Sequence, residues 1–552
     1  MKSITLSPKK NTDYQITKLS LWIPLLALIA FFGLPMLGIF WHSLIDDNTG
    51  QLGLSNYISV LTMPGVWQAT FNSLLLSITT TFLTLILAFI VAYGIECTMM
   101  PAKRFISSII TLPIIAPSLV LGLGLIFLLG RNGIIGNLFS MRLNIYGFWG
   151  LLIANVLYAL PQAILIVRTS LKNADARQYE AANVLGASNW RQFKDITLAD
   201  AKYGILSAAF VVFTITITDF GNAIVIGGDF SVLATEIYSQ VNGQMKFGMG
   251  AVIGIMLLIP AATAVWIEHS ASKRREKIGV SSVVPYQPTP NRRRDLSFFA
   301  IISMIAFCVL AVILTVVMVS FMKLWPYNLS FTLAHYAIDL DGGYSSLWNS
   351  IAISLMAAII GTSSLFFLTF GIRRHKGSGR GLAIMLSSLP VGVPGLVLGL
   401  SYVFSFNTAD LPWGILYGSA ILIALCNYYH YHTQGYTTMM TGMRNVPDSL
   451  DEATQVLGGK TKHVLRDVYL SAMSLTLVSV ALFLFMRSMV SLSAVIFLVS
   501  PAMPLGAVTI MRLDEAGLTS QAAAFSTCIM AIVSIMSLLL HYVTNKRRKL
   551  GQ

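Results

Sequence analysis

Long apolar stretches separated by short polar loops dominate the chain, and this pattern predicts its helices. Twelve stretches are long enough to cross a bilayer, since a membrane-spanning helix needs about 20 predominantly apolar residues. The pattern therefore predicts an all-α polytopic membrane protein with twelve transmembrane helices. The predicted spans are Leu21–Trp41, Gln68–Tyr93, Phe105–Leu129, Gly147–Val167, Tyr203–Gly227, Phe247–Glu268, Ser297–Met322, Ser345–Gly371, Gly381–Phe404, Trp413–Met439, Ser471–Leu498 and Thr519–Val543.

The basic residues of the loops orient these spans. Of the 37 Lys and Arg residues, almost all lie in the two terminal tails and in every second loop. Because Lys and Arg are retained on the cytoplasmic side of a membrane, both termini are predicted to be cytoplasmic. The first span has polar residues before it and no small-residue cleavage site, so we expect it to be retained. The basic residues of the opposite side are Arg131, Arg142, Lys246, Lys323 and Arg512.

The second half of the chain repeats the first. The sequence 71–73 (Phe-Asn-Ser) recurs as 348–350 (Trp-Asn-Ser), 277 residues later, and 119–123 (Leu-Val-Leu-Gly-Leu) recurs as 396–400 at the same offset. Each half contains six spans in the same orientation, which predicts two parallel repeats. We place the first repeat at residues 1–268 and the second at 297–552. Residues 269–296, with two basic clusters and three prolines, are predicted to be a cytoplasmic linker.

The composition supports this interpretation and excludes others. The chain is 55% hydrophobic and 11% charged, whereas an average soluble domain is about 25% charged. The net charge of +14 comes from loop residues that can contact membrane lipid, and these do not form the single basic patch of a nucleic-acid-binding protein. The four cysteines have no metal-like spacing, so neither a metal site nor a disulfide framework is predicted.

A polar sequence occurs in one cytoplasmic loop of each half, at about 169–202 and about 440–470, with the two copies 272 residues apart. A single copy would be explained by an amphipathic helix lying on the membrane. Two copies in register indicate one docking surface used twice by a partner outside the membrane. Alanines after the glutamate would let the partner approach the backbone closely. The residues predicted to dock are Glu180, Ala181, Ala182, Leu185, Gly186, Glu452, Ala453, Thr454, Leu457 and Gly458.

Helix signals flank each copy of this sequence. Asp175 can cap a short helix, Gly186 is suited to end it, and Ser188 can start a second helix. Asp448, Asp451 and Gly458 are predicted to play similar parts in the second copy. We therefore expect a short helix, a glycine turn and a second helix in each loop.

Two ionisable residues lie at membrane depth. Arg487 falls within the eleventh span and Asp219 within the fifth, at the position equivalent to Ser491. A charge at the bilayer centre costs about 2.5–3.5 kcal/mol on insertion scales, so each needs a partner. We expect Asp219, Arg487, Ser491 and Ser493 to line the interface between the halves or the translocation pathway. The alternative is that Arg487 snorkels or caps a kink, while Asp219 forms hydrogen bonds near the outer surface.

Prolines are paired at i and i+4 in the third and ninth spans, as Pro113 with Pro117 and Pro390 with Pro394. Proline removes a backbone donor and bends a helix. Bent helices beside a pore can gate it, but ordinary helix packing would explain the same residues.

The repeated loop resembles a known signature. The pattern Glu-Ala-Ala, three residues, Gly, nine residues, Ile-x-Leu is similar to that of permeases of ATP-binding-cassette (ABC) importers, with Ala199 and Ser471 at the usual proline position. The resemblance covers nearly the whole chain, as two fused halves. It implies the type I ABC importer permease fold, and it implies that each loop is a coupling helix docking one of two copies of a cytoplasmic ATPase subunit. ATP and Mg²⁺ would be held by that ATPase, since this chain has no phosphate-binding loop. A periplasmic binding protein would deliver the solute.

A closer resemblance concerns the cargo. The sequences 203–235 and 491–517 are similar to fused permeases assigned to 2-aminoethylphosphonate uptake, although Asn222-Ala223-Ile224 departs from their pattern. Ferric-iron and hexose-phosphate permeases share much of this sequence. The resemblance therefore implies a phosphorus-containing anion as cargo, with ferric ion or a hexose phosphate as alternatives. From another class, a twelve-helix secondary transporter would need a coupling-ion site, for which Asp219 is the candidate.

Overall fold

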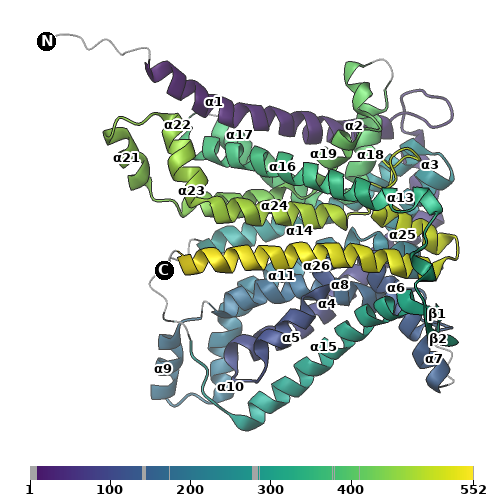
Figure 1. Ribbon diagram of the computed structural model, residues 1–552, viewed down its shortest axis with the longest axis horizontal. Coiled ribbons are helices and arrows are strands. Elements are labelled where there is room, and N and C mark those ends of the chain that lie inside the picture. Colours follow the sequence, from purple (N-terminus) through teal and green to yellow (C-terminus); the bar gives the residue numbers. More distant parts are fainter. Residues whose placement is uncertain are drawn as a thin grey trace. The chain divides into compact units, whose positions relative to one another are not determined.

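The computed structural model describes residues 9–139, 144–172, 174–276, 284, 286–375, 377, 379–408 and 411–550. Its helices form two compact units. We call Ser43–Ile338 with Ile510–Cys528 the first-half unit, and Met1–His42 with Asp339–Thr509 and Ile529–Gln552 the second-half unit. Each consists mainly of long apolar helices, as the hydrophobic pattern predicts (Figure 1).

The first-half unit is built around three long helices, α4, α8 and α11, which pack on one another. Buried alanine, valine, leucine and isoleucine side chains fill the space between them. One antiparallel hairpin, β1 to β2, pairs Met322 with Phe331 and Leu324 with Asn328. The helices and strands are α3 (Ser55–Thr62), α4 (Pro64–Cys97), α5 (Lys103–Ile110), α6 (Ser118–Leu129), α7 (Ile134–Phe139), α8 (Phe148–Lys172), α9 (Ala176–Val184), α10 (Asn189–Gln192), α11 (Leu198–Ile217), α12 (Gly221–Ile226), α13 (Leu233–Tyr238), α14 (Phe247–Glu276), α15 (Arg292–Phe321), β1 (Met322–Leu324) and β2 (Asn328–Phe331).

The second-half unit repeats this plan around α16, α19 and α24. Its helices are α1 (Lys9–Leu28), α2 (Leu34–Ser43), α16 (Ser345–Arg374), α17 (Gly379–Ser388), α18 (Gly395–Phe406), α19 (Ala420–His430), α20 (His432–Arg444), α21 (Asp448–Val456), α22 (Thr461–His463), α23 (Leu470–Ala472) and α24 (Ser474–Met489). The helices α25 (Gly506–Glu515) and α26 (Thr519–Leu550) contain residues of both units.

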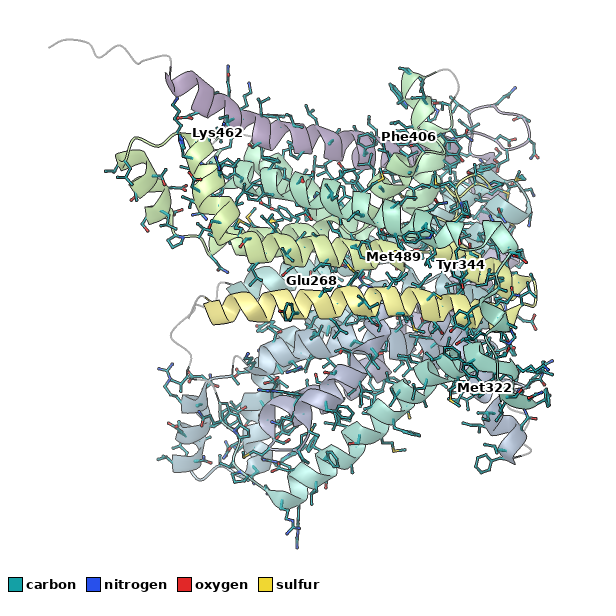
Figure 2. All side chains as sticks on the ribbon, in the orientation of Figure 1. Glu268, Met322, Tyr344, Phe406, Lys462 and Met489 are labelled. Carbon is teal, nitrogen blue, oxygen red and sulfur yellow. The ribbon has the colours of Figure 1, made fainter. Side chains whose placement is uncertain are left out.

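The first helix of each repeat packs in the unit named for the other repeat. Helix α1 lies along α16 and α17 (Figure 1). The Phe31 ring, on the π-helical turn after α1, stacks on Phe406 at 5.8 Å between centroids, and its carbonyl accepts a hydrogen bond from the Tyr402 hydroxyl. Phe406 lies at the end of α18 (Figure 2). Reciprocally, α15 packs on α4, α5 and α6. The compact units therefore do not coincide with the sequence repeats, because each repeat donates its first helix.

Several of the twelve predicted spans are interrupted. Among the described residues, nine helices are long and apolar enough to cross a membrane, and two bent pairs bring the number to eleven. The predicted tenth span, Trp413–Met439, is broken at Tyr431, between α19 and α20, and its apolar helix is short. The fifth and eleventh helices are shorter than the predicted spans, since α11 ends at Ile217 and α24 ends at Met489.

The proline pairs lie at helix breaks. Pro113 starts a 3₁₀ turn after α5, and Pro117 directly precedes α6. Pro390 and Pro394 take the same places before α18, where the axes of the two helical segments differ by 112°. The missing proline N–H explains why the helix stops and restarts at these positions. A role of these breaks in gating stays a prediction.

Helical structure extends into both ends of the predicted linker of residues 269–296. Helix α14 continues to Glu276, and α15 already begins at Arg292. Residues 277–283 and 285 of that linker lie outside the described residues. Val284 and Tyr286 are described, and they contact the first-half unit.

Candidate functional site

The first repeated loop forms α9, a glycine turn and α10, as its sequence predicts. Asp175 is the N-cap of α9, and its carboxylate accepts a hydrogen bond from the Arg177 amide at 3.1 Å. The Arg177 side chain donates to the same carboxylate and, with backbone hydrogen bonds, lowers the pKa of Asp175. The capping carboxylate therefore stays ionised, which stabilises the first turn of α9.

A glycine turn ends α9. Gly186 has φ +70°, a backbone conformation that costs glycine little. The Ala187 amide donates to the Ala182 carbonyl at 2.9 Å and the Gly186 amide donates to the Asn183 carbonyl at 3.0 Å, the two bonds of a Schellman motif. Ser188 then caps α10 through the Arg191 amide. The turn redirects the chain within a few residues, so α9 projects from one end of the unit (Figure 1).

The second loop has the same backbone. Helix α21 carries Glu452, and Gly458 follows it with φ +76°. The Gly459 amide donates to the Thr454 carbonyl at 2.8 Å, which is the equivalent of the bond made by Ala187. Both copies then enter a π-helical turn, Phe193–Thr197 in the first loop and Val464–Tyr469 in the second. The two loops are thus structural repeats as well as sequence repeats.

Each loop ends its first helix on two apolar residues that lie in solvent. Val184 and Leu185 are 89% and 84% exposed, and Val456 and Leu457 are both 87% exposed. Glu180 and Glu452 are exposed one turn earlier in their helices. An apolar pair repeated at this exposure on a tight turn, beside an acid, is suited to enter a pocket on a partner protein. The sequence prediction named the glutamates and leucines, and it missed the two valines.

In each loop, a contact joins the first helix to the π-helical turn before the next transmembrane helix. The two contacts lie at equivalent positions but use different residues. In the first loop the Tyr179 hydroxyl contacts the Thr197 hydroxyl at 2.8 Å, both side chains being buried. Burial raises the pKa of Tyr179 to about 12, so the hydroxyl remains protonated. In the second loop, Tyr469 occupies the position equivalent to Thr197, and Asp451 occupies the position equivalent to Tyr179. The Tyr469 hydroxyl donates a hydrogen bond to the Asp451 carboxylate at 3.0 Å. Both loops therefore make this contact, between two hydroxyls in the first loop and between a hydroxyl and a carboxylate in the second.

Arginines from α16 hold the second loop. The Arg373 guanidinium donates to the Met443 carbonyl, to the Val446 carbonyl at 2.7 Å and to the Asp448 carboxylate at 2.5 Å. Arg374 lies 3.5 Å from the Asp451 carboxylate. These bonds fix the end of α20 and the start of α21 to the end of α16. A guanidinium is suited to this work because it presents several donors in a rigid plane.

Helix α1 also supports the second loop. The Asp13 carboxylate accepts a hydrogen bond from the Thr461 amide, at the start of α22, at 3.1 Å. In the first loop, Ser188 provides this cap from within the loop. Lys462, labelled in Figure 2, takes the position that the exposed Trp190 occupies in the first loop. The backbone of the two loops is thus shared, while their side chains differ.

The predicted pathway residues lie at the ends of broken helices. Asp219 follows α11, is buried, and accepts a hydrogen bond from the Asn222 amide, in the first turn of α12, at 3.0 Å. Arg487 lies in the last turn of α24, and its guanidinium lies 5.7 Å from the centre of the Tyr431 ring. Each thus has a partner within its own unit. Pairing of Asp219 with Arg487 stays a prediction.

Ser491 and Ser493 lie after α24, where the chain turns. Ser491 lines a cavity of about 10 Å³ with Asn427 and Ser488, a volume near the minimum for one water molecule. Ser493 packs on the start of α18, since a Cβ on Gly395 would come within 2.3 Å of its hydroxyl. The first repeat makes the same contact with the residues exchanged, between Ser118 and Gly221.

The repeated Asn-Ser sequence has a structural function that its sequence did not reveal. In the first-half unit, Asn72 donates to the Ser231 carbonyl at 2.9 Å and the Ser73 hydroxyl accepts from the Leu233 amide at 2.8 Å. In the second-half unit, Asn349 and Ser350 make the equivalent bonds to Pro504 and Gly506. The motif pins the segment that follows the broken fifth or eleventh span. The recurrence of Asn-Ser at a fixed offset was the sequence feature that could have indicated this structural function.

Comparison with known proteins finds a family model and several relatives that are similar to this chain. Residues 99–277, which include the first loop, match the family described as binding-protein-dependent transport system inner membrane component. FbpB 1 of Haemophilus influenzae, assigned by its name to ferric transport, is 28% identical over 87% of this chain and 78% of its own length. The ferric transport system permease protein FbpB of Actinobacillus pleuropneumoniae is 25% identical over 95% of this chain and 78% of its own length.

A shorter relative aligns with part of the chain. The molybdenum transport system permease protein ModB of Haemophilus influenzae is 29% identical over 37% of this chain and 93% of its own length. A solved bacterial ABC transporter that imports alginate aligns over 48% of this chain, at 17% identity and a TM-score of 0.40. The match of residues 99–277 and the two long relatives make this chain similar to inner-membrane permease subunits of binding-protein-dependent transport systems, which are transport components.

Proposed function

We propose that the two loops are coupling helices, each docking one of two copies of a cytoplasmic ABC ATPase subunit. The observation that carries this proposal is the pair of equivalent turns that present Val184 with Leu185 and Val456 with Leu457 to solvent. ATP and Mg²⁺ are held by the ATPase, and this chain binds no cofactor. The loops, and with them both chain termini, then lie in the cytoplasm, which agrees with the distribution of Lys and Arg.

The motion follows from how the loops are held. ATP-driven closure of the two ATPase subunits draws the two docked loops toward each other. Each loop passes this displacement to its unit through the Tyr179–Thr197 or Asp451–Tyr469 contact. A periplasmic binding protein supplies the solute on the outer side, and hydrolysis of ATP resets the permease. The permease itself catalyses no reaction.

Ferric iron is the cargo that we now favour. Support comes from the two relatives that align with 87% and 95% of the chain, both named for ferric transport. The second candidate is 2-aminoethylphosphonate, which rests on the resemblance of residues 203–235 and 491–517. Selection of the solute rests mainly with the binding protein, so the permease constrains the choice weakly.

Reconstitution tests the importer and its cargo together. The permease is placed in liposomes with its ATPase inside and its binding protein outside, and uptake of labelled ferric iron and 2-aminoethylphosphonate is measured with and without ATP. We expect ATP-dependent uptake of ferric iron that needs all three components. Uptake of the phosphonate alone would reverse the order of the two candidates. Uptake without the ATPase would contradict the proposal.

We further propose that Asp219 and Arg487 contribute jointly to the interface between halves or to the pathway. Each is a charge that the sequence predicts at membrane depth, where it must be compensated. A double-mutant cycle with Asp219→Asn and Arg487→Gln, read out as transport, tests this. Simply additive effects would show that the two residues act independently.

A further inference from the structure

The segment between the two repeats does more than connect them. The Ala176 amide, at the first residue of α9, donates to the Val284 carbonyl at 2.8 Å. The Val284 amide in turn donates to the Asp175 carboxylate, which caps the same helix. Two reciprocal hydrogen bonds therefore fasten Val284 to the start of the first coupling helix.

Tyr286 continues this attachment with its ring. It lies 4.3 Å from the Tyr179 ring, between centroids, at an interplanar angle of 35°. Tyr286 is half-buried and packs on the hydrophobic core between α4, α8 and α11. Tyr179 is thus held on one side by Thr197 and on another by Tyr286, so the side chain that anchors α9 depends on the connecting segment.

The far end of the segment is fixed as well. The Asp295 carboxylate, in the first turn of α15, accepts a hydrogen bond from the Met99 amide, between α4 and α5, at 3.2 Å. It also accepts from the Asn291 amide at 3.0 Å, and Arg294 donates to the Thr289 carbonyl at 2.6 Å. Residues 286–291 are therefore held between two attachment points, Tyr179 and Met99, within one unit.

The second loop shows what this segment replaces. There, Arg373 at the end of α16 donates to the backbone at the start of the loop. The equivalent residue at the end of α4, 277 positions earlier, is Glu96, whose carboxylate cannot donate a hydrogen bond to a carbonyl and instead pairs with Arg168 at 2.7 Å. The first loop thus lacks the arginine brace, and the connecting segment supplies the contact.

We propose that Tyr286, together with the Val284 backbone, is a positioning element for ATP coupling: it holds the first coupling helix in the orientation that the ATPase engages. The inference rests on the proposed function, since it assumes that this helix docks the ATPase. It differs from a passive tether, because a tether would tolerate any residue at 286. The positioning element acts through Tyr179 and does not itself contact the partner.

The test compares Tyr286→Ala, Tyr286→Phe and, as a matched control, Gln287→Ala, since Gln287 is exposed on the same segment. The readouts are the affinity of the purified ATPase for the reconstituted permease and the number of solute molecules transported per ATP hydrolysed. We expect Tyr286→Ala to lower the affinity about tenfold, the size of one lost aromatic pair, and to lower the transport ratio. Tyr286→Phe keeps the ring and should retain both values, as should Gln287→Ala.

Two further variants keep the outcome decisive. If Tyr286→Ala does not accumulate, Val284→Pro removes the amide that donates to Asp175 and should lower the transport ratio in the same direction. Leu185→Glu, measured in parallel, tests the docking itself. Normal coupling in Leu185→Glu would overturn the proposed function, whereas loss in Leu185→Glu with normal coupling in both Tyr286→Ala and Val284→Pro would overturn only the positioning inference.

Discussion

The two coupling loops present an equivalent exposed apolar pair but are supported in different ways. Both end a short helix on an exposed apolar pair before a glycine of positive φ. The first is held by Val284 and Tyr286 of the connecting segment, and the second by Arg373 of α16 and Asp13 of α1. The difference indicates that the face toward the partner is constrained, while any nearby element with suitable donors can serve as support.

The supports follow the exchange of first helices. Asp13 lies in the first helix of the first repeat and braces the loop of the second repeat. Val284 and Tyr286 lie just before the first helix of the second repeat and brace the loop of the first. Each loop is therefore held in part by a residue in, or just before, the first helix of the other repeat. In a fused chain, this arrangement makes the connecting segment part of the mechanism.

The largest effect is expected when both docking surfaces are disrupted together. The double variant Glu180→Lys with Glu452→Lys reverses the charge on both loops and should abolish uptake, while the protein still accumulates in the membrane. Gln51→Lys, an exposed residue outside the loops, is the control for added charge. Uptake and stimulated ATP hydrolysis are measured in the same proteoliposomes. Unchanged values in the double variant would refute the role of the loops in coupling.

The second test asks whether the two apolar pairs are equivalent. Leu185→Ala and Leu457→Ala each remove a side chain that we expect the ATPase to bury, and burial of a leucine contributes about 1.5–3 kcal/mol. Each variant should weaken ATPase binding by about tenfold or more. The melting temperature of the permease alone should not change, because both leucines are exposed. An effect confined to one loop would show that the surfaces are not used alike.

The third test separates the supports. Arg373→Ala removes the donors to the backbone of the second loop, and hydrogen bonds from a charged group contribute about 1.5–3 kcal/mol. Amide hydrogen exchange should become faster in α21 and remain unchanged in α9. Arg373→Lys, which keeps the charge but not the planar donor geometry, should give an intermediate result. Equal acceleration in both helices would contradict independent support.

The smallest effect concerns the exchanged anchor. Tyr179→Phe and Thr197→Val each remove one hydroxyl of a buried contact, and the double variant removes both. Because a neutral hydrogen bond contributes about 0.5–1.5 kcal/mol net, a double-mutant cycle on thermal stability should give a coupling of about 1 kcal/mol. In the second loop, Tyr469→Phe leaves Asp451 next to Arg374 and should cost less. A coupling energy of zero would show that the contact between the two hydroxyls does not stabilise the protein.

The sequence by itself determined the membrane fold, the repeat and the form of the loops. Apolar segments of spanning length can be buried only in lipid. The caps and stops are local signals, so Asp175, Gly186 and Gly458 predicted their turns from neighbouring residues alone. The prolines likewise predicted where the third and ninth spans bend, because the missing N–H acts within one helix. The recurrence at 272 and 277 residues revealed two copies of each feature.

Only the tertiary structure decided which elements support which loop. The bond from Tyr402 to the Phe31 carbonyl, like the contact of Tyr286 with Tyr179, joins residues more than a hundred positions apart. No periodicity of the sequence predicts such a pairing, because each long apolar helix could pack against several similar helices. The exchange of Tyr179 and Thr197 for Asp451 and Tyr469 was hidden for the same reason. Caps and turns depend on neighbouring residues and can be predicted from the sequence, whereas the partners of a helix depend on tertiary packing.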